Sequence, residues 1–325
     1  MIDDATEYSG ILCIGDPHTC SITPGTRMES DFATLSVNKL KFSLEYADKH
    51  NLLPVCLGDL LTKHDDNNIV FFGMLMGVLA SHPNMICLVG NHDKSEHETF
   101  NESDMINIID KADVIHLINS PGVFGEFNID GQKVTLGASP YGHDIPDEVK
   151  SNNEVVWFTH HDVNFDPRFA HIACKNIKGC RTVVNGHLHK TFEPIRVGNT
   201  LWHNPGNILR MSRAEKEHTP SIWIWHPSDV NTLEQVIIPH NKDVFIEEKD
   251  GIVVDDTVDP FSMEESRSIF VEALKSDVSI DAHKTQDGSL VRGYIQQAFV
   301  DVQPCDDVKE LVMKMLDDVV EEQQA

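Results

Sequence analysis

Polar side chains of the kinds that bind metal ions follow five separate apolar segments of this sequence, at the point where each segment ends. The apolar segments are short enough to be strands, and they run over 11–15, 53–57, 85–89, 155–158 and 182–185. The side chains that follow them are Asp16 and His18, Asp59, Asn91 and His92, His160 and His161, and His187 and His189. Because strand ends in an α/β fold meet at one edge of a sheet, we expect these side chains to form one site.

The residue types indicate which chemistry such a site performs. Carboxylate and imidazole ligands together suit Mn, Fe or Zn better than Ca, which prefers oxygen ligands alone. Two such ions about 3.5–4 Å apart can share a bridging carboxylate and activate a water for in-line attack on phosphorus. Two carboxylates and neutral imidazoles leave this centre positively charged, so that it attracts a phosphate. The pattern therefore predicts a two-metal phosphoesterase.

The other segments alternate strands with helices at first and then read as hairpins. A period of 3.6 residues predicts a helix over 32–50, and an apolar run predicts a buried helix over 69–80. Asp130-Gly131 predicts a two-residue hairpin turn. Further strands are expected over 123–127, 133–137, 192–197, 221–225 and 233–238. This order predicts a layered α/β domain.

Residues 243–260 are acidic and read as a connector or an edge hairpin. We expect 1–240 to form the metal-binding domain, and 241–325 to form a small C-terminal region that caps it or docks a partner. A capping box predicts a helix over 262–275, and one apolar stripe predicts a helix over 306–321. Such a stripe belongs more often to an ordinary core than to a docking surface.

The five motifs GDPH, GDLL, GNHD, THHD and GHLH occur in this order and resemble those of the calcineurin-like metallophosphoesterase superfamily. The resemblance covers about residues 10–225. It implies an α/β fold, built as a four-layer αββα sandwich with a small C-terminal α+β capping region. It also implies hydrolysis of phosphate esters with two divalent ions, for which we expect Mn, with Fe, Zn or Mg as alternatives.

The resemblance also implies a role for each motif residue. The first metal would be held by Asp16, His18 and His189, the second by Asn91, His160 and His187, and Asp59 would bridge them. We prefer His160 over His161 as the ligand, but the sequence leaves both open. His92 would donate a proton to the leaving oxygen or stabilise the charged transition state, and Asp93 would orient His92.

Within the superfamily, the sequence most resembles the SbcD-type nucleases of DNA double-strand-break repair. The resemblance lies in Gly25-Thr26-Arg27 with Asp31-Phe32, in the stretch 202–212 with Glu215 close behind, and in Ile237-Ile238-Pro239. It implies a DNA exo- or endonuclease subunit that acts in repair and recombination. Such a subunit would work with an SMC-like ATPase and form a homodimer. One interpretation is that the protein is encoded by a phage. The expected substrate contacts are Arg27, Arg210, His161 and His64.

Two features depart from these nucleases. Thr62 stands where they usually carry a histidine, with His64 two residues later, and the segment after 240 is short for a full capping region and a partner-binding tail. One alternative is therefore a phosphodiesterase or phosphatase that acts on nucleotides or other small phosphate esters. A second alternative is a non-catalytic scaffold, which the complete ligand set disfavours.

The net charge bears on the DNA hypothesis. The chain has 52 acidic and 26 basic side chains, a formal charge of −26, which disfavours binding of a polyanion. The acidity lies in the flanking regions, because residues 151–225 have 9 basic and 6 acidic side chains, net +3. This segment could form a basic rim beside the metals, or its cations could be scattered and solvated. In both cases we expect weak DNA binding by the isolated chain.

The N-terminal residues and the cysteines indicate in which cellular compartment the protein is expected. The first ten residues hold three acids and no base, unlike a secretory signal, and the apolar run 69–80 is too short to span a bilayer. Seven cysteines, an odd number, read as reduced thiols, so we expect a cytoplasmic protein that does not bind membranes. A zinc site at His171, Cys174 and Cys180 would lack a fourth ligand and is disfavoured.

Overall fold

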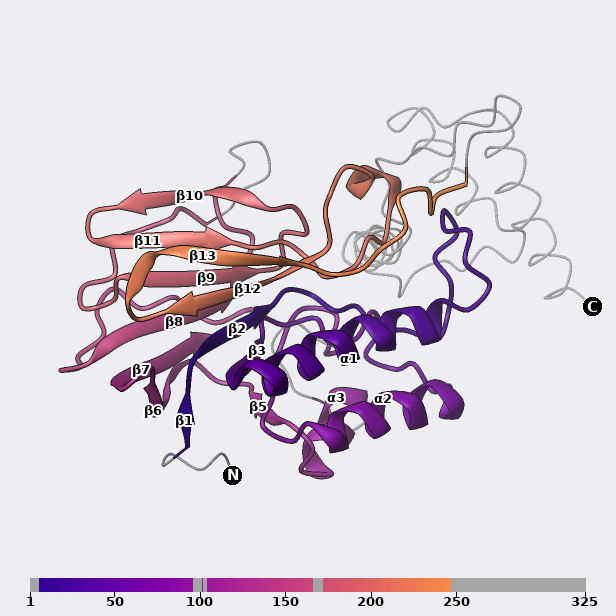
Figure 1. The fold of residues 1–325 in the computed structure, drawn as a ribbon, viewed down its shortest axis with the longest axis horizontal. Helices are drawn as coiled ribbons and strands as arrows, with labels where there is room; N and C mark the ends of the chain where they lie inside the picture. Colours follow the sequence, from indigo (N-terminus) through magenta and orange to yellow (C-terminus); the bar gives the residue numbers. More distant parts are fainter. Residues whose placement is uncertain (1–5, 96–100, 102–103, 166–171, 247–325) are drawn as a thin grey trace, which may run out of the picture. The chain divides into compact units, whose positions relative to one another are not determined.

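The computed structural model describes residues 6–95, 101, 104–165 and 172–246, which all belong to one compact unit of the chain, residues 1–257. This unit is built on two β-sheets, of six and seven strands (Figure 1). The helices predicted over 262–275 and 306–321 lie outside the described residues, and the domain boundary at 240 stays a prediction. Within the described ranges, no helix is both long and apolar enough to cross a membrane.

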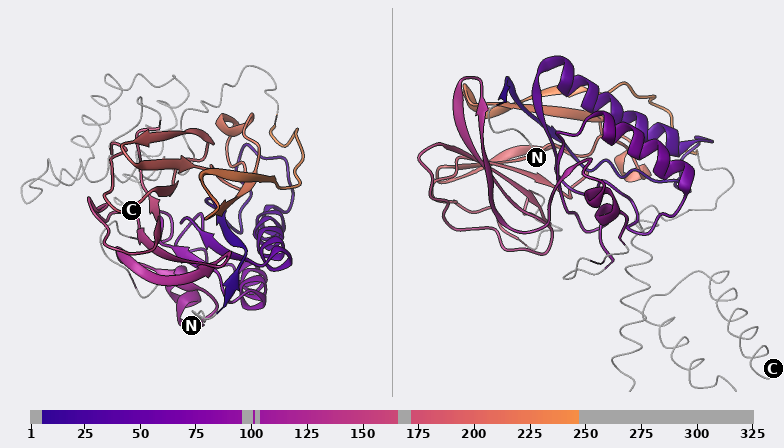
Figure 2. Two further views of the ribbon diagram at one scale, coloured as in Figure 1. Left: turned by 60° about the vertical axis from the view of Figure 1, so that its left-hand side comes forward. Right: turned by 90° about the horizontal axis from the view of Figure 1, so that it is seen from below.

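The six-stranded sheet is mainly parallel. Its strands are β2 (Gly10–Ile14), β3 (Leu52–Cys56), β4 (Ile86–Leu88), β5 (His116–Ile118), β12 (Ser221–His226) and β13 (Asp229–Ile237). Strands β2 to β5 run parallel in this order, whereas β12 pairs antiparallel with both β2 and β13. The parallel strands are connected by α1 (Phe32–His50), α2 (Ile69–Ser81) and α3 (Met105–Lys111). Helices α1 and α2 lie side by side on the outer face of this sheet (Figure 2).

The seven-stranded sheet combines parallel strands with hairpins. Its strands are β1 (Glu7–Tyr8), β6 (Gly122–Ile129), β7 (Gln132–Ser139), β8 (Glu154–His160), β9 (Thr182–Gly186), β10 (Phe192–Val197) and β11 (Thr200–Asn204). Strands β7, β8, β9 and β11 are parallel neighbours, and β6 and β10 pair antiparallel at either side. The predicted hairpin turn is confirmed, because Asp130 and Gly131 both have positive φ, 48° and 70°.

The main core lies between the two sheets. Val156 and Phe158 of β8 point into it and meet apolar side chains of β2, β3 and β4. The alternate residues Val155 and Trp157 face the other way, because successive side chains of a strand point to opposite faces. In the described ranges, α-helices pack on the six-stranded sheet, while irregular segments between 145 and 180 cover Trp157 and its neighbours. The predicted α/β sandwich is confirmed.

The helix over 32–50 was predictable from its period, and its ends are capped. The Asp31 carboxylate accepts a hydrogen bond from the N–H of Thr34 at 3.0 Å, and Asn51 ends the helix in the left-handed conformation. The elements β1, α3 and β5 were not predicted, because two, seven and three residues are too few to show a period.

Candidate metal centre

All seven predicted metal ligands lie at the carboxyl ends of parallel strands. Asp16 and His18 follow β2, Asp59 follows β3, Asn91 follows β4, His160 ends β8, and His187 and His189 follow β9. Four of them have a positive φ, which non-glycine residues rarely adopt: Asp16 at 27°, His18 at 43°, Asp59 at 48° and His187 at 73°. Strained backbone of this kind concentrates at functional sites.

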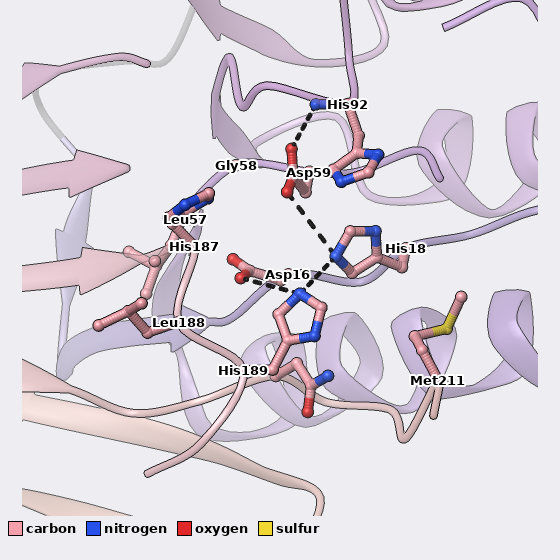
Figure 3. Close-up of polar contacts among 12 residues, drawn as sticks. Asp16, His18, Leu57, Gly58, Asp59, His92, His187, Leu188, His189 and Met211 are labelled. Atoms are coloured by element: carbon pink, nitrogen blue, oxygen red, sulfur yellow. Dashed lines mark hydrogen bonds and ion pairs between the residues drawn. The ribbon is translucent and has the colours of Figure 1, made fainter. Parts of the chain in front are cut away.

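A first cluster consists of Asp16, His18 and His189, whose ligand atoms lie within 4.8 Å of one another. Figure 3 shows these three side chains pointing toward one another. The Nε2 atoms of His18 and His189 are 2.9 Å apart. The Nδ1 atom of His189 lies 2.6 Å from Oε1 of the buried Glu215. A carboxylate that binds Nδ1–H orients the ring and leaves Nε2 free to bind a metal.

A second cluster consists of Asp59, His160 and His187, again with ligand atoms within 4.8 Å of one another. The carbonyl of Leu57 accepts the Nδ1–H of His160 at 2.8 Å, which leaves Nε2 of this ring as the ligand atom. The amide oxygen of Asn91 adds a fourth group, at 3.1 Å from Nε2 of His160 and 3.0 Å from Nδ1 of His187. The side chains predicted to bind a second metal therefore lie close together.

Asp59 lies between the two clusters. Its Oδ2 atom is 3.2 Å from Nε2 of His160 and 3.7 Å from Nε2 of His18. Its Oδ1 atom accepts a hydrogen bond from the backbone N–H of His92 at 2.9 Å (Figure 3). One oxygen therefore faces both clusters while the other holds the carboxylate in place.

The residues present fit a pair of divalent cations. Asp16 is 1% exposed, and neither of its carboxylate oxygens has a hydrogen-bond partner among the described residues. The rings of His160 and His189 lie 3.8 Å and 4.0 Å from these oxygens, too far for hydrogen bonds. A buried carboxylate without hydrogen bonds is costly, and a bound cation would remove that cost. Ligands that each lie about 2.1 Å from one ion are about 3–4 Å apart. The ligand atoms of each cluster lie within 4.8 Å of one another, so small movements would bring them to this spacing.

The carboxylates respond differently to this environment. Burial raises the pKa of Asp16 to about 6, and the Asp59 carboxylate contributes in the same direction. Burial also acts to raise the pKa of Asp59, but the imidazoles of His160 and His92 outweigh it and hold that pKa well below its usual range. Asp59 is therefore charged at neutral pH.

The pKa values of the histidines also shift in opposite directions. Burial acts to lower the pKa of His160 and of His189, but Asp59 beside His160 and Glu215 beside His189 raise both pKa values to about 9. Burial lowers the pKa of His187 to about 3, with a further contribution from His160. In the metal-free protein two of these rings therefore hold a proton that a cation must displace.

His92 lies beside the first cluster and belongs to neither ligand set. Its ring centroid is 5.1 Å from that of His18. Its Nδ1 atom is 3.0 Å from the carbonyl oxygen of Thr62, and because a carbonyl can only accept, Nδ1 carries the hydrogen. Its Nε2 atom is therefore the one that can exchange a proton with a substrate.

Asp93 has a different role from the one predicted. It was expected to orient His92, but its oxygens accept the backbone N–H groups of Leu61 at 3.0 Å and Gly90 at 2.8 Å. The Thr62 carbonyl orients the His92 ring instead. Asp93 thus ties the segment after β3 to the segment after β4, and burial raises its pKa to about 7.

The structure distinguishes His160 from His161. His160 lies in the second cluster, whereas Nε2 of His161 donates a hydrogen bond to the carbonyl of His143 at 2.8 Å. Burial lowers the pKa of His161 to about 4. His64 lies 3.2 Å from the carboxylate of Asp104, measured from its Nδ1 atom. Substrate contacts by His161 and His64 stay predictions.

The two arginines that were expected to contact substrate are used within the protein. The guanidinium of Arg27 bonds both carboxylate oxygens of Glu29 and the carbonyl of Arg210. The guanidinium of Arg210 bonds the carbonyls of Lys216 and Asn241. Both arginines line a cavity to which none of the clustered ligands contributes. Substrate contacts by Arg27 and Arg210 stay predictions, as they do for His161 and His64.

Glu215 and Thr62 contact His189 and His92, and the sequence did not reveal either contact. An acid shortly after the stretch 202–212 was the available signal for Glu215, but nothing in its spacing indicated that it contacts His189. Thr62 acts through its backbone carbonyl, which the residue type cannot disclose. His171 lies outside the described residues, and neither Cys174 nor Cys180 joins a metal-type cluster in the described part of the chain.

Comparisons with known proteins give limited similarity. No protein-family model and no curated protein matches the chain. The solved structure of the NAD nucleotidase NadN from Haemophilus influenzae is 11% identical at a TM-score of 0.40, over 89% of this chain and 60% of that chain. The chain thus spans less than two thirds of that neighbour. A hypothetical protein from Thermus thermophilus is also 11% identical at a TM-score of 0.40, over 70% of this chain and 98% of that chain. Similarity at this level carries no argument about function.

Proposed function

We propose that this chain is a metal-dependent phosphoesterase that uses two divalent ions. The observation that carries the proposal is the position of Asp59. Its Oδ2 atom lies 3.2 Å from Nε2 of His160 in the second cluster and 3.7 Å from Nε2 of His18 in the first. A carboxylate shared by two sets of ligands is the arrangement that two-metal hydrolysis of phosphate esters requires. Membership of the calcineurin-like metallophosphoesterase superfamily is proposed on the same ligands and on the order of their motifs.

The chain's own residues have distinct tasks in this reaction. Asp16, His18 and His189 would hold one ion, Asn91, His160 and His187 the other, and Asp59 both. When bound, the ions lower the pKa of a water and neutralise charge on the phosphate. His92, fixed through Nδ1–H on the Thr62 carbonyl, transfers a proton at Nε2 to the leaving oxygen.

We propose more specifically that the substrate is a phosphodiester in DNA and that the chain is a nuclease subunit of the SbcD type. The sequence resemblance around Arg27 and Arg210 supports this, as does the net +3 charge of residues 151–225. Manganese as the physiological metal, DNA repair and recombination as the process, a homodimer, an SMC-like ATPase partner and a cytoplasmic location belong to the same proposal.

A second candidate is hydrolysis of nucleotides or other small phosphate esters. One structural observation favours it: Arg27 and Arg210 are buried and bonded internally, so they are not available to bind a DNA backbone at the metals. A small substrate also suits a chain with a charge of −26, because it needs no extended basic surface.

An assay series in Mn²⁺ separates these candidates. Purified full-length chain is given linear duplex DNA, single-stranded DNA, bis-p-nitrophenyl phosphate and p-nitrophenyl phosphate, with Asp59→Asn as the control that should lose both metals and all turnover. Cleavage of DNA and the diester supports the nuclease. Activity on the monoester alone would exclude the nuclease and leave a phosphatase. No activity on any substrate, with both metals bound, would favour a scaffold or a missing ATPase partner.

A further inference from the structure

A cavity of about 310 Å³ lies beside the first part of α1 and has no part in the metal clusters. Its walls come from α1, from the segments at 27–29 and 209–210, and from the segment 239–244 that follows β13. Residues 26–28 and 244–246 are held together as two short antiparallel pieces, since Met28 N–H bonds the Val244 carbonyl at 3.0 Å and Ile246 N–H bonds the Thr26 carbonyl at 2.9 Å. The walls are therefore fixed by the fold.

Three buried cations line this cavity. Lys39 is 7% exposed, Arg27 is 6% exposed and Arg210 is 4% exposed. Basic side chains are almost never buried so completely unless negative charge or hydrogen-bond acceptors compensate them. Within the described ranges, the Lys39 ammonium donates one hydrogen bond of 2.8 Å, to the carbonyl of Pro239, although it has three donors.

Among the described residues, the negative charge at the cavity does not balance these cations. Glu29 is the one carboxylate among the described lining residues, and it is paired with Arg27 at 2.5 Å. Two further acids act on Arg210, but Glu215 is bonded to His189 and Asp243 is exposed. Burial and the two guanidinium groups lower the pKa of Lys39 to about 8, which reflects the same excess of positive charge.

We propose that this cavity is a binding site for a phosphate group, separate from the metal centre, in which Lys39 donates hydrogen bonds while Arg27 and Arg210 supply positive charge. An ammonium binds phosphate as a point charge, and guanidinium groups are weakly hydrated cations suited to such sites. The cavity has the size of a small-ligand site, so the phosphate belongs to free orthophosphate or to a mononucleotide.

The test uses full-length chain from which metals have been removed by a chelator, so that the two metal clusters cannot recruit phosphate. Orthophosphate and adenosine 5′-monophosphate are titrated in separate calorimetric experiments at low ionic strength. We expect one saturable site per chain, and the stronger of the two titrants identifies the source of the phosphate group. Absence of saturable binding by both titrants overturns the proposal.

Variants of α1 assign the site to this cavity. Lys39→Met should weaken binding about tenfold or more, because it removes a charge-assisted hydrogen bond. Lys41→Met is the matched control, because Lys41 lies on the same helix with its side chain 50% exposed and paired to Glu45. It should bind as the wild type does. Equal affinities of Lys39→Met and Lys41→Met would contradict the proposal.

A second variant tests the charge argument in the opposite direction. Glu29→Gln keeps the shape of the wall but removes its carboxylate, so phosphate should bind more tightly than to the wild type. This variant stays informative if Lys39→Met does not fold. Unchanged or weaker binding would show that phosphate does not sit beside Arg27. None of these measurements uses turnover, so their outcome is independent of the proposed phosphoesterase activity.

Discussion

His92 lies beside the candidate metal ligands but belongs to neither cluster. Its position suits proton transfer to a substrate. Replacing it with alanine removes the proton donor but leaves Asp59 and its ligand neighbours in place, since Asp59 accepts from the backbone N–H of residue 92. We expect turnover of the diester substrate to fall by about 10²–10⁴-fold, while two metals per chain are retained. Metal content measured alongside turnover checks this. Loss of a metal from His92→Ala would show that the ring is a ligand.

Glu215 contacts a histidine of the first cluster, so we expect it to affect how tightly this cluster binds an ion. Glu215→Gln removes the carboxylate charge beside His189, which weakens Nε2 as a ligand and relaxes the ring orientation. We expect the affinity of one of the two metal sites to fall by about 10–100-fold, so that a Mn²⁺ titration resolves one tight and one weak site. Glu217→Gln is the control, because Glu217 is exposed nearby. Two equally weakened sites would contradict this assignment.

The candidate metal ligands could be predicted from the sequence because each of them stands at the end of a predicted strand. Asp16, Asp59 and His187 come within two residues of the ends of apolar segments, and that pattern is visible without coordinates. The surroundings of a charge are not visible in this way. The guanidinium of Arg27 bonds Glu29, two residues away, and the carbonyl of Arg210, 183 residues away, and only the folded chain shows both contacts.

At the scale of elements, α2 shows where sequence periodicity gives incomplete information. The helix was predicted over 69–80 and is found over Ile69–Ser81, but the expected burial is wrong. Phe71, Leu75 and Leu79 are buried, whereas Ile69 is 76% exposed and Val70 is 69% exposed. An almost entirely apolar segment carries no polar face, so its sequence cannot indicate which side meets the sheet.

The exposed side of α2 carries a glycine that can be replaced with benefit. A Cβ atom added at Gly73 meets nothing within 4 Å, so alanine fits there and lowers the conformational entropy of the unfolded chain. We expect Gly73→Ala to raise the free energy of unfolding by about 0.5–1 kcal/mol. Urea unfolding followed by circular dichroism measures this change.

Gly58, at the end of β3, is the matched contrast for Gly73. Its φ is 116°, and an added Cβ would lie 2.2 Å from Nδ1 of His160. The same substitution should therefore destabilise the protein and displace a metal ligand. If Gly58→Ala proved as stable as Gly73→Ala, the backbone around the second cluster would be less constrained than the structure shows.

At the scale of the whole molecule, the site depends on two sheets facing each other. Strands β2, β3 and β4 of one sheet and β8 and β9 of the other supply the ligands, so neither sheet alone holds a complete set. The sequence predicted that all five strand ends belong to one site. It could not predict how the strands divide between two sheets, because the apolar segments of both sheets look alike.

Buried histidines also make the stability of the whole unit depend on pH, and His203 on β11 provides the clearest test. It is 3% exposed, its Nε2 atom has no hydrogen-bond partner within the described residues, and burial lowers its pKa to about 4. The ordinary pKa is 6.5, so the unfolded chain binds a proton that the folded chain does not accept between pH 6.5 and 4. The stabilisation is complete above pH 6.5 and is lost as the pH falls through that window.

The difference between wild type and His203→Leu isolates this contribution. Over the whole window the wild type should lose about 3 kcal/mol relative to the variant, because each pKa unit corresponds to about 1.4 kcal/mol. Urea unfolding of both proteins is measured at steps from pH 7.5 to 4 with a chelator present, so that metal binding does not enter the comparison. The variant has no histidine to protonate at this position, so its curve should fall less steeply toward acid. Parallel curves would show that His203 accepts a proton in the folded state as easily as in the unfolded chain.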